Sequence, residues 1–251
     1  MTDSTGGALP VVRFIGSGRA GGALSAGLAG CGWSVRAPLG RGDDLRAAAG
    51  GVDLLVVATP DDVIAEVAAR VEPVSTTVVA HLAGSLGLDV LAPHGRRAAI
   101  HPLISIPVPE TDLSGAWFAV AGDPMAARVV DALDGRSFTV GDEHRGGYHA
   151  AACIASNHLV ALLGQVERVG ASAGVPLEPF LDLAQGALDQ VRALGPAGAL
   201  TGPARRGDEA TLARHLEALD PSERGAYEAL MLAAKRLAGT PESPRRMSRW
   251  P

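Results

Sequence analysis

The stretch "VVRFIGSGRAGGAL", residues 11–24, sets the expected fold of the chain. Its β-branched and aromatic start predicts a strand, and its alanine-rich continuation predicts a helix. Gly16, Gly18 and Gly21 stand in the turn between the two. This spacing allows a tight turn, a close approach of backbone to a pyrophosphate, and close packing of helix on strand. It predicts a dinucleotide-binding unit, and the alternative is a plain turn in which glycine only relieves steric crowding.

Residues 1–142 alternate short apolar runs with alanine-rich stretches, the pattern of strand–helix units on a mostly parallel sheet. Strands are expected at 11–15, 33–37, 53–58, 76–81, 97–101, 116–121 and 137–140. Helices are expected near 20–30, 43–49, 61–70, 86–92 and 124–134. The first half is therefore predicted to be an α/β Rossmann domain with a doubly wound parallel sheet.

From residue 143 the strand-like runs end and helical patterns fill the chain. Helices are expected near 147–173, 177–193, 208–218 and 221–238. We therefore predict an all-α C-terminal domain at 143–251, in which the aperiodic residues 239–251 form a loose tail. Its long Ala- and Leu-rich helices have more apolar surface than one short bundle can hide, so a homodimer through this domain is expected.

Composition limits the classes of partner. The chain has 251 residues, 47% of them hydrophobic, and a net charge of -5 with scattered arginines. This argues against nucleic acid and anionic membranes and favours a small-molecule substrate. No signal sequence and no run of about 18 apolar residues is present, so a cytoplasmic protein is expected. Cys31 and Cys153 have no metal-ligand spacing, so no metal is expected.

The end of the second predicted strand lacks the acidic residue that usually binds the ribose 2′-hydroxyl of NAD. Arg36 and Arg41 stand near that place instead. A guanidinium matches a 2′-phosphate better than a hydroxyl pair, so NADP is favoured while NAD stays possible. The alternative is that both arginines are ordinary solvated charges.

Polar residues follow the carboxyl ends of three further strands, where open α/β sheets bind ligands. Thr59, Pro60 and Asp61 follow the third strand, and His81 and His101 end the fourth and fifth. Two histidines at adjacent strand ends favour a functional role over a structural one. Ser85, shortly after the first histidine, is expected to contact substrate. The residues expected to bind cofactor are Gly16, Ser17, Gly18, Arg19, Ala20, Gly21, Arg41, Thr59, Pro60, Asp61 and His81.

The apolar helix "GGYHAAACIASNHLVALL", residues 146–163, carries an unexpected group of polar side chains. At 3.6 residues per turn, Cys153 and Ser156 fall within about 40° of His149, and Asn157 lies about 80° from the histidine. Histidine suits proton transfer because both of its protonation states are accessible near neutral pH. The alternative is a buried polar cluster that specifies helix packing.

The segment "LTGPARRGD", residues 200–208, separates two predicted helices. Thr201 and Arg206 offer a hydroxyl and a guanidinium to a substrate carboxylate, as Ser156 offers a hydroxyl from the polar helix. Asp208 is placed to cap the next helix. A tight structural turn is an equal alternative for this segment.

Several motifs together resemble the Rossmann-like oxidoreductases that carry an uncharacterised all-helical C-terminal domain. They are the glycine turn and the sequences "ATPDD", "VVAHLAGSLGLDVL", "HPLISIP", "YHAAACIASNHLVAL" and "ALTGPARRGDEATLARHLEAL". That family is similar to pyrroline-5-carboxylate reductase, ketopantoate reductase, 3-hydroxyisobutyrate dehydrogenase and the 6-phosphogluconate dehydrogenase group. The resemblance implies NAD(P) binding and a helical domain that often dimerises, without fixing a substrate.

One departure from the related enzymes concerns their catalytic lysine on the first helix of the second domain. Lys235, the sole lysine of this chain, lies near the end of the last predicted helix. His149 occupies the comparable place, with Asn157 two turns later as its positioning partner. We therefore expect His149 to be the general acid. His101, whose "HPL" resembles the "HPM" of prephenate dehydrogenases, is expected to bind substrate.

The sequence thus predicts an NAD(P)-dependent oxidoreductase that transfers a hydride between NADP(H) and a small carbonyl or imine acid. The alternative is a non-catalytic dinucleotide-binding sensor or scaffold protein that keeps the pocket without turnover.

Overall fold

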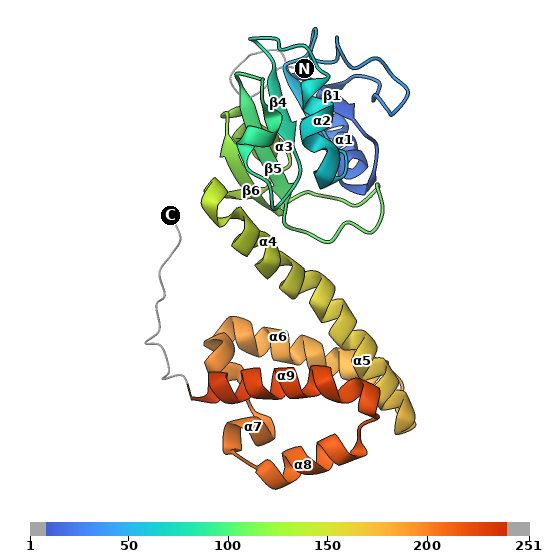
Figure 1. Cartoon of the computed structure of the whole chain (residues 1–251), viewed down its shortest axis with the longest axis vertical. Coiled ribbons are helices and arrows are strands. Elements are labelled where there is room, and N and C mark those ends of the chain that lie inside the picture. The colour runs from blue at the N-terminus through green and yellow to red at the C-terminus, as the bar shows by residue number, and fades with distance from the viewer. Residues whose placement is uncertain (1–8, 240–251) are drawn as a thin grey trace. The chain divides into compact units, whose positions relative to one another are not determined.

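The computed structural model describes residues 9–239 (Figure 1). The chain divides into two compact units, an α/β unit (Met1–Ser156) and a helical unit (Asn157–Pro251). The division falls inside a continuous helical segment, beyond the boundary predicted after residue 142. The predicted fold class, a Rossmann sheet followed by an all-helical region, is confirmed. Except for Gly239, the predicted tail lies outside the described residues.

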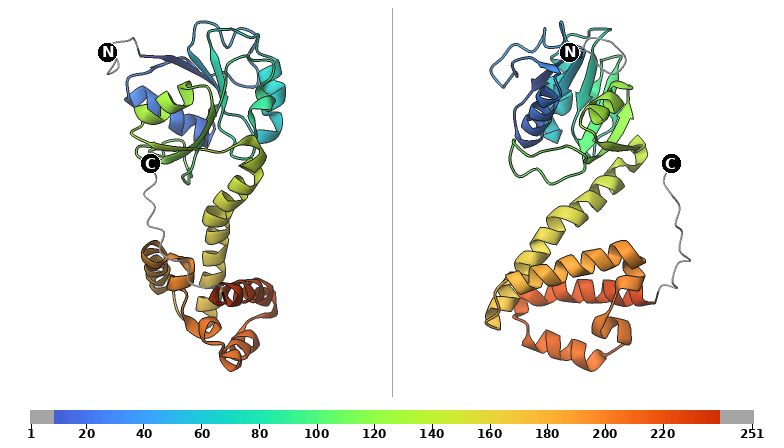
Figure 2. Two further views of the ribbon diagram at one scale, coloured as in Figure 1. Left: turned by 90° about the vertical axis from the view of Figure 1, so that its left-hand side faces the viewer. Right: turned by 180° about the vertical axis from the view of Figure 1, so that it is seen from behind.

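A seven-stranded sheet forms the centre of the α/β unit (Figure 2). Its strands are β1 (Val11–Ile15), β2 (Ser34–Val35), β3 (Leu54–Val57), β4 (Val78–His81), β5 (Arg97–Pro102), β6 (Trp117–Gly122) and β7 (Arg136–Thr139). They lie in the order β2-β1-β3-β4-β5-β6-β7, and every pair is parallel except β5 with β6. The strand order reverses at β1, so the carboxyl ends of β1 and β3 form the switch point where such sheets bind ligands.

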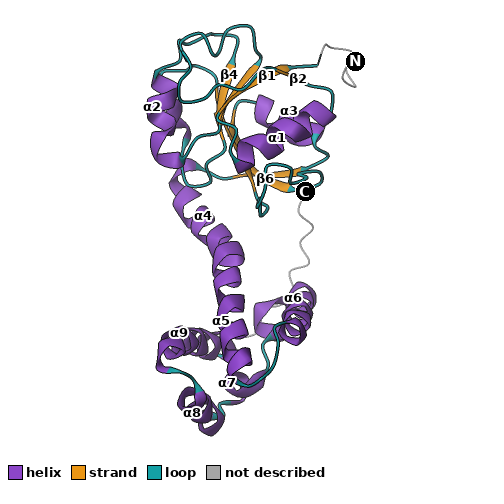
Figure 3. Ribbon diagram, turned by 90° about the vertical axis from the view of Figure 1, so that its right-hand side faces the viewer, coloured by secondary structure: helices purple, strands orange, loops and turns teal. Residues whose placement is uncertain are grey.

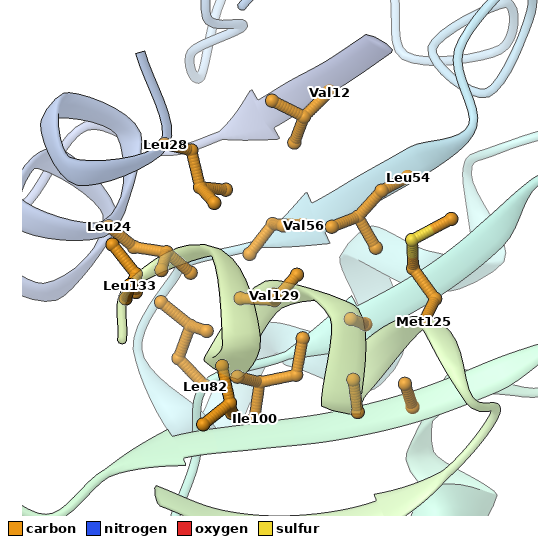
Figure 4. Packing of buried hydrophobic residues seen from close by; sticks show 14 of the residues in the cluster. Val12, Leu24, Leu28, Leu54, Val56, Leu82, Ile100, Met125, Val129 and Leu133 are labelled. Atoms are coloured by element: carbon orange, nitrogen blue, oxygen red, sulfur yellow. The ribbon is translucent and has the colours of Figure 1, made fainter. Parts of the chain in front are cut away.

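Helices cover both faces of the sheet (Figure 3). On one face α1 (Arg19–Gly30) and α3 (Met125–Ala132) pack against the strands, with Leu24, Leu28 and Val129 among the buried contacts (Figure 4). On the other face α2 (Ile64–Ala69) packs through its apolar residues. Burial on both faces explains why the inner strands read as continuous apolar runs instead of alternating.

The helix predicted at 43–49 is wrong. Leu45, Ala48 and Ala49 are buried with helical spacing, but the chain forms successive turns, such as the bond from the Ala48 N–H to the Leu45 carbonyl. Asp43 accepts from the Gly40 N–H and so closes a turn instead of capping a helix. The helix predicted near 86–92 is also reduced to a short 3-10 helix, Leu88–Leu91. Helical periodicity therefore arose here without a helix.

The helical segment from Arg145 to Ser172 changes its winding midway. It consists of α4 (Arg145–Cys153), a π-helical turn (Ile154–His158) and α5 (Leu159–Ser172). The sequence predicted the helix at 147–173 but assumed uniform winding of 3.6 residues per turn. A π-helical turn bonds i to i+5, so the angles assigned to Ser156 and Asn157 do not hold beyond Ile154.

The helical unit continues with α6 (Glu178–Ala199), α7 (Gly202–Arg206), α8 (Glu209–Ala218) and α9 (Pro221–Ala238). The backbone leaves helical geometry at Gly195, which has a φ of 72°. The Asp208 side chain caps α8 by accepting from the Thr211 N–H at 3.1 Å, as predicted. The Gln165 amide on α5 donates to the Glu223 carbonyl on α9 at 2.8 Å. The segment 200–208 holds a short helix where a tight turn was the alternative.

Candidate functional site

The turn between β1 and α1 leaves no space for side chains at two of its glycines. Gly16 has a φ of +95°, and a Cβ there would lie 2.6 Å from the Ala58 carbonyl oxygen. At Gly21 a Cβ would lie 2.7 Å from the Cβ of Ala58. At Gly18 it would meet nothing within 4 Å among the described residues. Gly16 and Gly21 therefore allow close packing against the end of β3, and Gly18 exposes bare backbone to an approaching ligand.

Donors for an anion surround this turn. Gly18, the N-cap of α1, has no side chain to cap the first backbone N–H groups of the helix. The Thr59 hydroxyl, just past β3, is buried and has no hydrogen-bond partner among residues 9–239. Ser17 and Arg19 are exposed on the turn, and Ala20 is half-buried. Uncapped N–H groups and a free hydroxyl suit a phosphate, so these residues fit the pyrophosphate of a dinucleotide.

The segment after β2 lies against the glycine turn. The Gly16 N–H donates to the Leu39 carbonyl at 2.8 Å, and Arg41 follows two residues later. Arg36 and Arg41 are exposed, and neither guanidinium has a hydrogen bond or ion pair with another described residue. The guanidiniums predicted to meet a 2′-phosphate are therefore available near the turn that would hold the cofactor.

The loops after β3 and β4 are joined to each other. The Ser85 hydroxyl donates to a carboxylate oxygen of Asp61 at 3.1 Å. Pro60 is extended at the N-cap of the 3-10 helix Asp61–Val63, which turns the chain toward α2. Because β1, β3, β4 and β5 are parallel neighbours, their carboxyl ends and these loops form one row along the same edge of the sheet.

His81 ends β4 and is 0% exposed. Its Nδ1 accepts from the Ala83 N–H at 3.2 Å, and its Nε2 lies 3.2 Å from the Gly87 carbonyl. These two bonds define the neutral ring with the proton on Nε2 and occupy both nitrogens. Burial lowers the pKa of His81 to about 4, with a further contribution from the charge of Arg145. In this geometry the ring holds the loop from Leu82 to Gly87 instead of facing solvent.

His101, at the end of β5, contacts two side chains of α4. Its Nδ1 lies 2.7 Å from the Tyr148 hydroxyl, and the two rings meet edge to face with centroids 5.6 Å apart. The His149 ring also meets His101 edge to face, with centroids 5.8 Å apart. The structure therefore brings together the two histidines that the sequence predicted for proton transfer and substrate binding, and adds a tyrosine.

Gly84 lies between these two histidines. A Cβ on this buried residue would be 2.5 Å from Cδ2 of His149 and 2.8 Å from Nε2 of His101. A side chain here would displace one ring or the other. Gly84 therefore allows the loop after β4 to pass close to both imidazoles while adding no side chain of its own on the Nε2 side of His101.

Arg145 begins α4 one turn before Tyr148 and His149 and is 0% exposed. Its Nε forms an ion pair with Asp142 Oδ1 at 3.4 Å, too long for a hydrogen bond. None of its three guanidinium nitrogens has a hydrogen-bond partner among the described residues. Asp142, in the short 3-10 helix Asp142–His144 just before α4, accepts from the Leu88 N–H at 3.0 Å, which joins this segment to the chain after β4.

The environment of this cluster changes two pKa values. Burial lowers the pKa of His101 to about 4, and repulsion from His149 and Arg145 acts in the same direction. Burial raises the pKa of Tyr148 to about 12, which the charge of Arg145 partly opposes. At neutral pH His101 is therefore uncharged and Tyr148 is protonated.

The other predicted residues lie further along the helices. Cys153 Sγ is 3.9 Å from His149 Nε2, and the Ser156 hydroxyl donates to the Ala152 carbonyl at 2.8 Å. Asn157, Thr201 and Arg206 belong to the helical unit, where all three are exposed. Thr201 is the N-cap of α7 and Arg206 lies in its last turn. The substrate roles predicted for Asn157, Ser156, Thr201 and Arg206 stay predictions.

Sequence reasoning missed Tyr148, Arg145 and Gly84. Tyr148 is next to His149 in the sequence, but its contact with His101 on β5 can be recognised only in the three-dimensional structure. Arg145 was not considered, although its spacing of three and four residues from Tyr148 and His149 was the available signal. Gly84 was one glycine among 32.

One family model matches the chain: "Domain of unknown function (DUF2520)", over residues 117–234. No curated protein matches it significantly. In the part of the chain that the structure describes, no helix is long and apolar enough to cross a membrane.

Solved structures of similar fold cover nearly the whole chain. A proposed NADP oxidoreductase of Bacteroides fragilis has 20% identity and a TM-score of 0.75, covering 91% of this chain and 98% of its own. A protein of Thermotoga maritima has 22% identity and a TM-score of 0.68, with coverage of 90% and 98%. The pyrroline carboxylate reductase of Plasmodium falciparum, with NADP bound, has 13% identity and a TM-score of 0.59, with coverage of 92% and 98%. The predicted resemblance is confirmed at the level of the fold.

Proposed function

We propose that the protein is an NADP(H)-dependent oxidoreductase acting on a small carbonyl or imine acid. One observation carries the proposal. A glycine turn with free phosphate donors and a cluster of two histidines and a tyrosine share one edge of the sheet. The Asp61–Ser85 bond joins the loop after β3, whose Ala58 packs on the glycine turn, to the loop after β4, whose Gly84 packs on the two histidines. Cofactor binding and proton transfer are the two requirements of hydride chemistry at a carbonyl or imine.

The cofactor would be held by the residues of the glycine turn, with Thr59 at the pyrophosphate and Arg41 at the 2′-phosphate. When bound, reduced nicotinamide supplies a hydride. The fold neighbours that bind NADP or NADPH include the pyrroline carboxylate reductase above and a reductive aminase of Aspergillus terreus, which support this choice over NAD. His81 supports the loop beside the cofactor instead of contacting it.

The proton donor is one of the two histidines that contact each other. Sequence reasoning favours His149, with Asn157 as its positioning partner, and the roles of Ser85, Thr201 and Arg206 toward the substrate remain part of the proposal. A positioned general acid contributes about 10²–10⁴-fold in rate, so the donor is identified by the size of its effect on turnover.

A homodimer through the helical unit is also proposed. Within the described residues α6 buries none of its side chains, and Leu183 and Leu194 are 70% and 53% exposed. Exposed apolar surface of this kind marks contact sites in soluble proteins. A cytoplasmic location is proposed on the composition of the sequence.

The test separates an enzyme from a sensor. NADPH binding is measured by fluorescence titration, and its consumption is then followed with 2-oxo acids, ketopantoate, pyrroline carboxylates and semialdehydes. The enzyme binds NADPH and consumes it with at least one compound. Binding without consumption across the panel supports the alternative, a dinucleotide-binding sensor or scaffold. A protein that does not bind NADPH contradicts both hypotheses.

A further inference from the structure

Tyr148 and His101 form a hydroxyl–imidazole pair with a defined direction. The hydroxyl lies 2.7 Å from Nδ1, the hydroxyl is protonated at neutral pH, and the imidazole is neutral. A phenol donates a hydrogen bond more readily than it accepts one, so its O–H points at the Nδ1 lone pair. His101 therefore carries its own proton on Nε2.

The Nε2 side of His101 is the side on which Gly84 has no side chain. A Cβ at Gly84 would lie 2.8 Å from Nε2, and the nearest side chain on that side is His149, with its Cδ2 2.5 Å from the same point. The glycine thus leaves the N–H of His101 accessible at the carboxyl edge of the sheet. This edge is also where the glycine turn would place a dinucleotide.

Arg145 supplies a positive charge that acts on His101. Its guanidinium is fully buried, lacks hydrogen bonds to the described residues, and has Asp142 as an ion-pair partner at 3.4 Å. Asp142 is half-exposed, so solvent screens the carboxylate more than it screens the guanidinium. The buried member of the pair therefore dominates the local potential.

The charged and titratable groups that act on His101 come from three neighbouring elements. Asp61, past β3, favours a positive ring, whereas His81 on β4 and Arg145 and His149 on α4 oppose it. Together with burial, the opposing groups outweigh Asp61 and lower the pKa of His101. An added positive charge is disfavoured at this place, and an added negative charge is favoured.

We propose that the site reduces a carbonyl group in preference to a protonated imine, that His101 Nε2 donates the proton with Tyr148 as its positioning residue and proton source, and that Arg145 favours the negative oxygen. This inference rests on the proposed function. A protonated imine arrives with a positive charge and with the proton already on its nitrogen, so it needs no donor and is repelled by Arg145. A carbonyl oxygen becomes negative during reduction and needs both the donor and the charge.

The step balances as follows. The reduced dinucleotide would give a hydride and be left oxidised, and the hydride would form a C–H bond at the carbonyl carbon while the C=O π electron pair moves to the oxygen. The oxygen takes the proton from Nε2 of His101, Nδ1 takes the proton of Tyr148, and solvent returns a proton to the phenolate. A phenol with a pKa of about 12 is a stronger acid than an alcohol, whose pKa is close to that of water, about 16. The transfer is therefore downhill.

The first experiment compares the two substrate classes on the full chain. After NADPH binding is established, turnover of each 2-oxo acid and semialdehyde is measured with and without ammonium or methylamine, which convert part of the carbonyl to imine. Turnover that does not increase with amine supports the proposal. Turnover that requires amine, or turnover of pyrroline carboxylates alone, overturns it while leaving the proposed oxidoreductase function intact.

The second experiment uses Tyr148→Phe, with Tyr227→Phe as its matched control. Tyr227 also places its hydroxyl 2.7 Å from Nδ1 of a histidine, His215, with an edge-to-face ring contact, but in the helical unit. Tyr148→Phe should lower kcat about 100-fold and shift its pH profile, with KM and NADPH affinity close to wild type. Tyr227→Phe should change none of these. Equal kcat values for wild type and Tyr148→Phe contradict the relay.

A third measurement needs no substrate. Nitrogen-15 NMR of the imidazoles should show His101 neutral at pH 7, protonated on Nε2, and titrating near 4. Tyr148→Phe should alter this tautomer balance, and Tyr227→Phe should not. A His101 that carries its proton on Nδ1 overturns the inference even if no substrate is found. Failure of NADPH to bind, in contrast, refutes the proposed function itself.

Discussion

Nearly all of the buried apolar side chains among the described residues lie in the α/β unit, whereas the helical unit leaves many of its leucines exposed. Two clusters cover the two faces of the sheet, from Val12 to Leu133 and from Ile15 to Leu91. In the helical unit Leu212 is the one buried large apolar side chain among the described residues. A sheet with helices on both faces completes its own core, whereas helices with apolar surface on several sides need a further surface to cover them.

The two tyrosine–histidine pairs show the same contrast at the level of chemistry. Tyr148–His101 and Tyr227–His215 share a 2.7 Å contact and an edge-to-face geometry. Burial raises the pKa of Tyr148 to about 12 and lowers that of His101 to about 4. Burial also raises the pKa of Tyr227, but this contact is exposed. The surroundings, more than the contact itself, decide which pair suits proton transfer.

The largest expected effect concerns the histidines of the α/β unit. His101→Gln should lower turnover about 10²–10⁴-fold with NADPH affinity near wild type, because it removes the donor. His149→Gln should have a smaller effect, and Asn157→Ala, in the helical unit, a milder one again. His215→Gln serves as the control for removing a histidine. If His149→Gln has the larger effect, the sequence-based assignment of the acid holds and the relay through His101 does not.

The next effect concerns the exposed leucines of α6. Leu183→Glu and Leu194→Glu, three turns apart on one face, should convert a dimer into a monomer, because a charge buried in an interface without a partner costs several kcal/mol. Sedimentation velocity at micromolar concentration measures the change. Ala47→Glu, which adds the same charge to an exposed site of the α/β unit, should leave the dimer intact. A wild-type species of only 25.5 kDa contradicts the dimer and the contrast drawn above.

A smaller effect tests the proposed contact of Arg41 with the cofactor in the α/β unit. Arg41→Ala should weaken NADP binding by about 1.5–3 kcal/mol through loss of a charge-assisted contact, while NAD binding stays nearly constant. Calorimetric titration with both dinucleotides measures the difference. Equal losses for both, or no loss for either, remove the assignment of the 2′-phosphate to this arginine.

The glycines of the turn test the packing of the same unit. Gly21→Ala should destabilise the protein by about 1–3 kcal/mol, because its Cβ would lie 2.7 Å from that of Ala58. Gly18→Ala meets no described atom within 4 Å and should leave stability nearly unchanged while weakening NADPH binding. Urea unfolding and fluorescence titration measure the two effects. A Gly18→Ala variant with unaltered NADPH affinity would place the pyrophosphate elsewhere.

The smallest effect is the response of stability to pH. His81 and His101 titrate near 4 in the folded chain and near 6.5 when unfolded, so the unfolded state binds more protons in between. The free energy of unfolding should therefore fall as the pH drops from 6.5 toward 4, on the order of 1 kcal/mol per histidine by pH 5.5. Urea unfolding at pH 7 and 5.5 measures it, and His101→Gln should reduce the slope. Equal stability at both pH values contradicts the burial argument.

Much of the fold was predictable because it depends on local patterns. The strands of the sheet, α1, α8 and α9 follow from apolar periodicity, turn residues and the cap at Asp208. The failures arose where the same pattern has two outcomes: Leu45, Ala48 and Ala49 have helical spacing in a run of turns, and nothing in the residues near Ile154 signalled a π-helical turn. Tertiary packing decides such cases.

The candidate site was predictable in part. The carboxyl-edge rule located His81 and His101, and helical spacing located His149. The rule gives the edge of the sheet but not the depth of a side chain, so it did not separate the buried His81 from the half-buried His101. The contacts of Tyr148, Arg145 and Gly84 span long separations in the chain and required the three-dimensional structure.

The bond from the Ala83 N–H to His81 Nδ1 makes a backbone amide report on a side chain. The same ring contacts the Gly87 carbonyl, so one imidazole fixes both ends of the loop that carries Gly84. Protonation of Nδ1 removes the acceptor and frees the amide. Hydrogen–deuterium exchange at Ala83 should therefore be slow near neutral pH and lose its protection near pH 4, independently of global unfolding. A single proton on this fully buried imidazole would then govern the order of the loop beside His101 and His149.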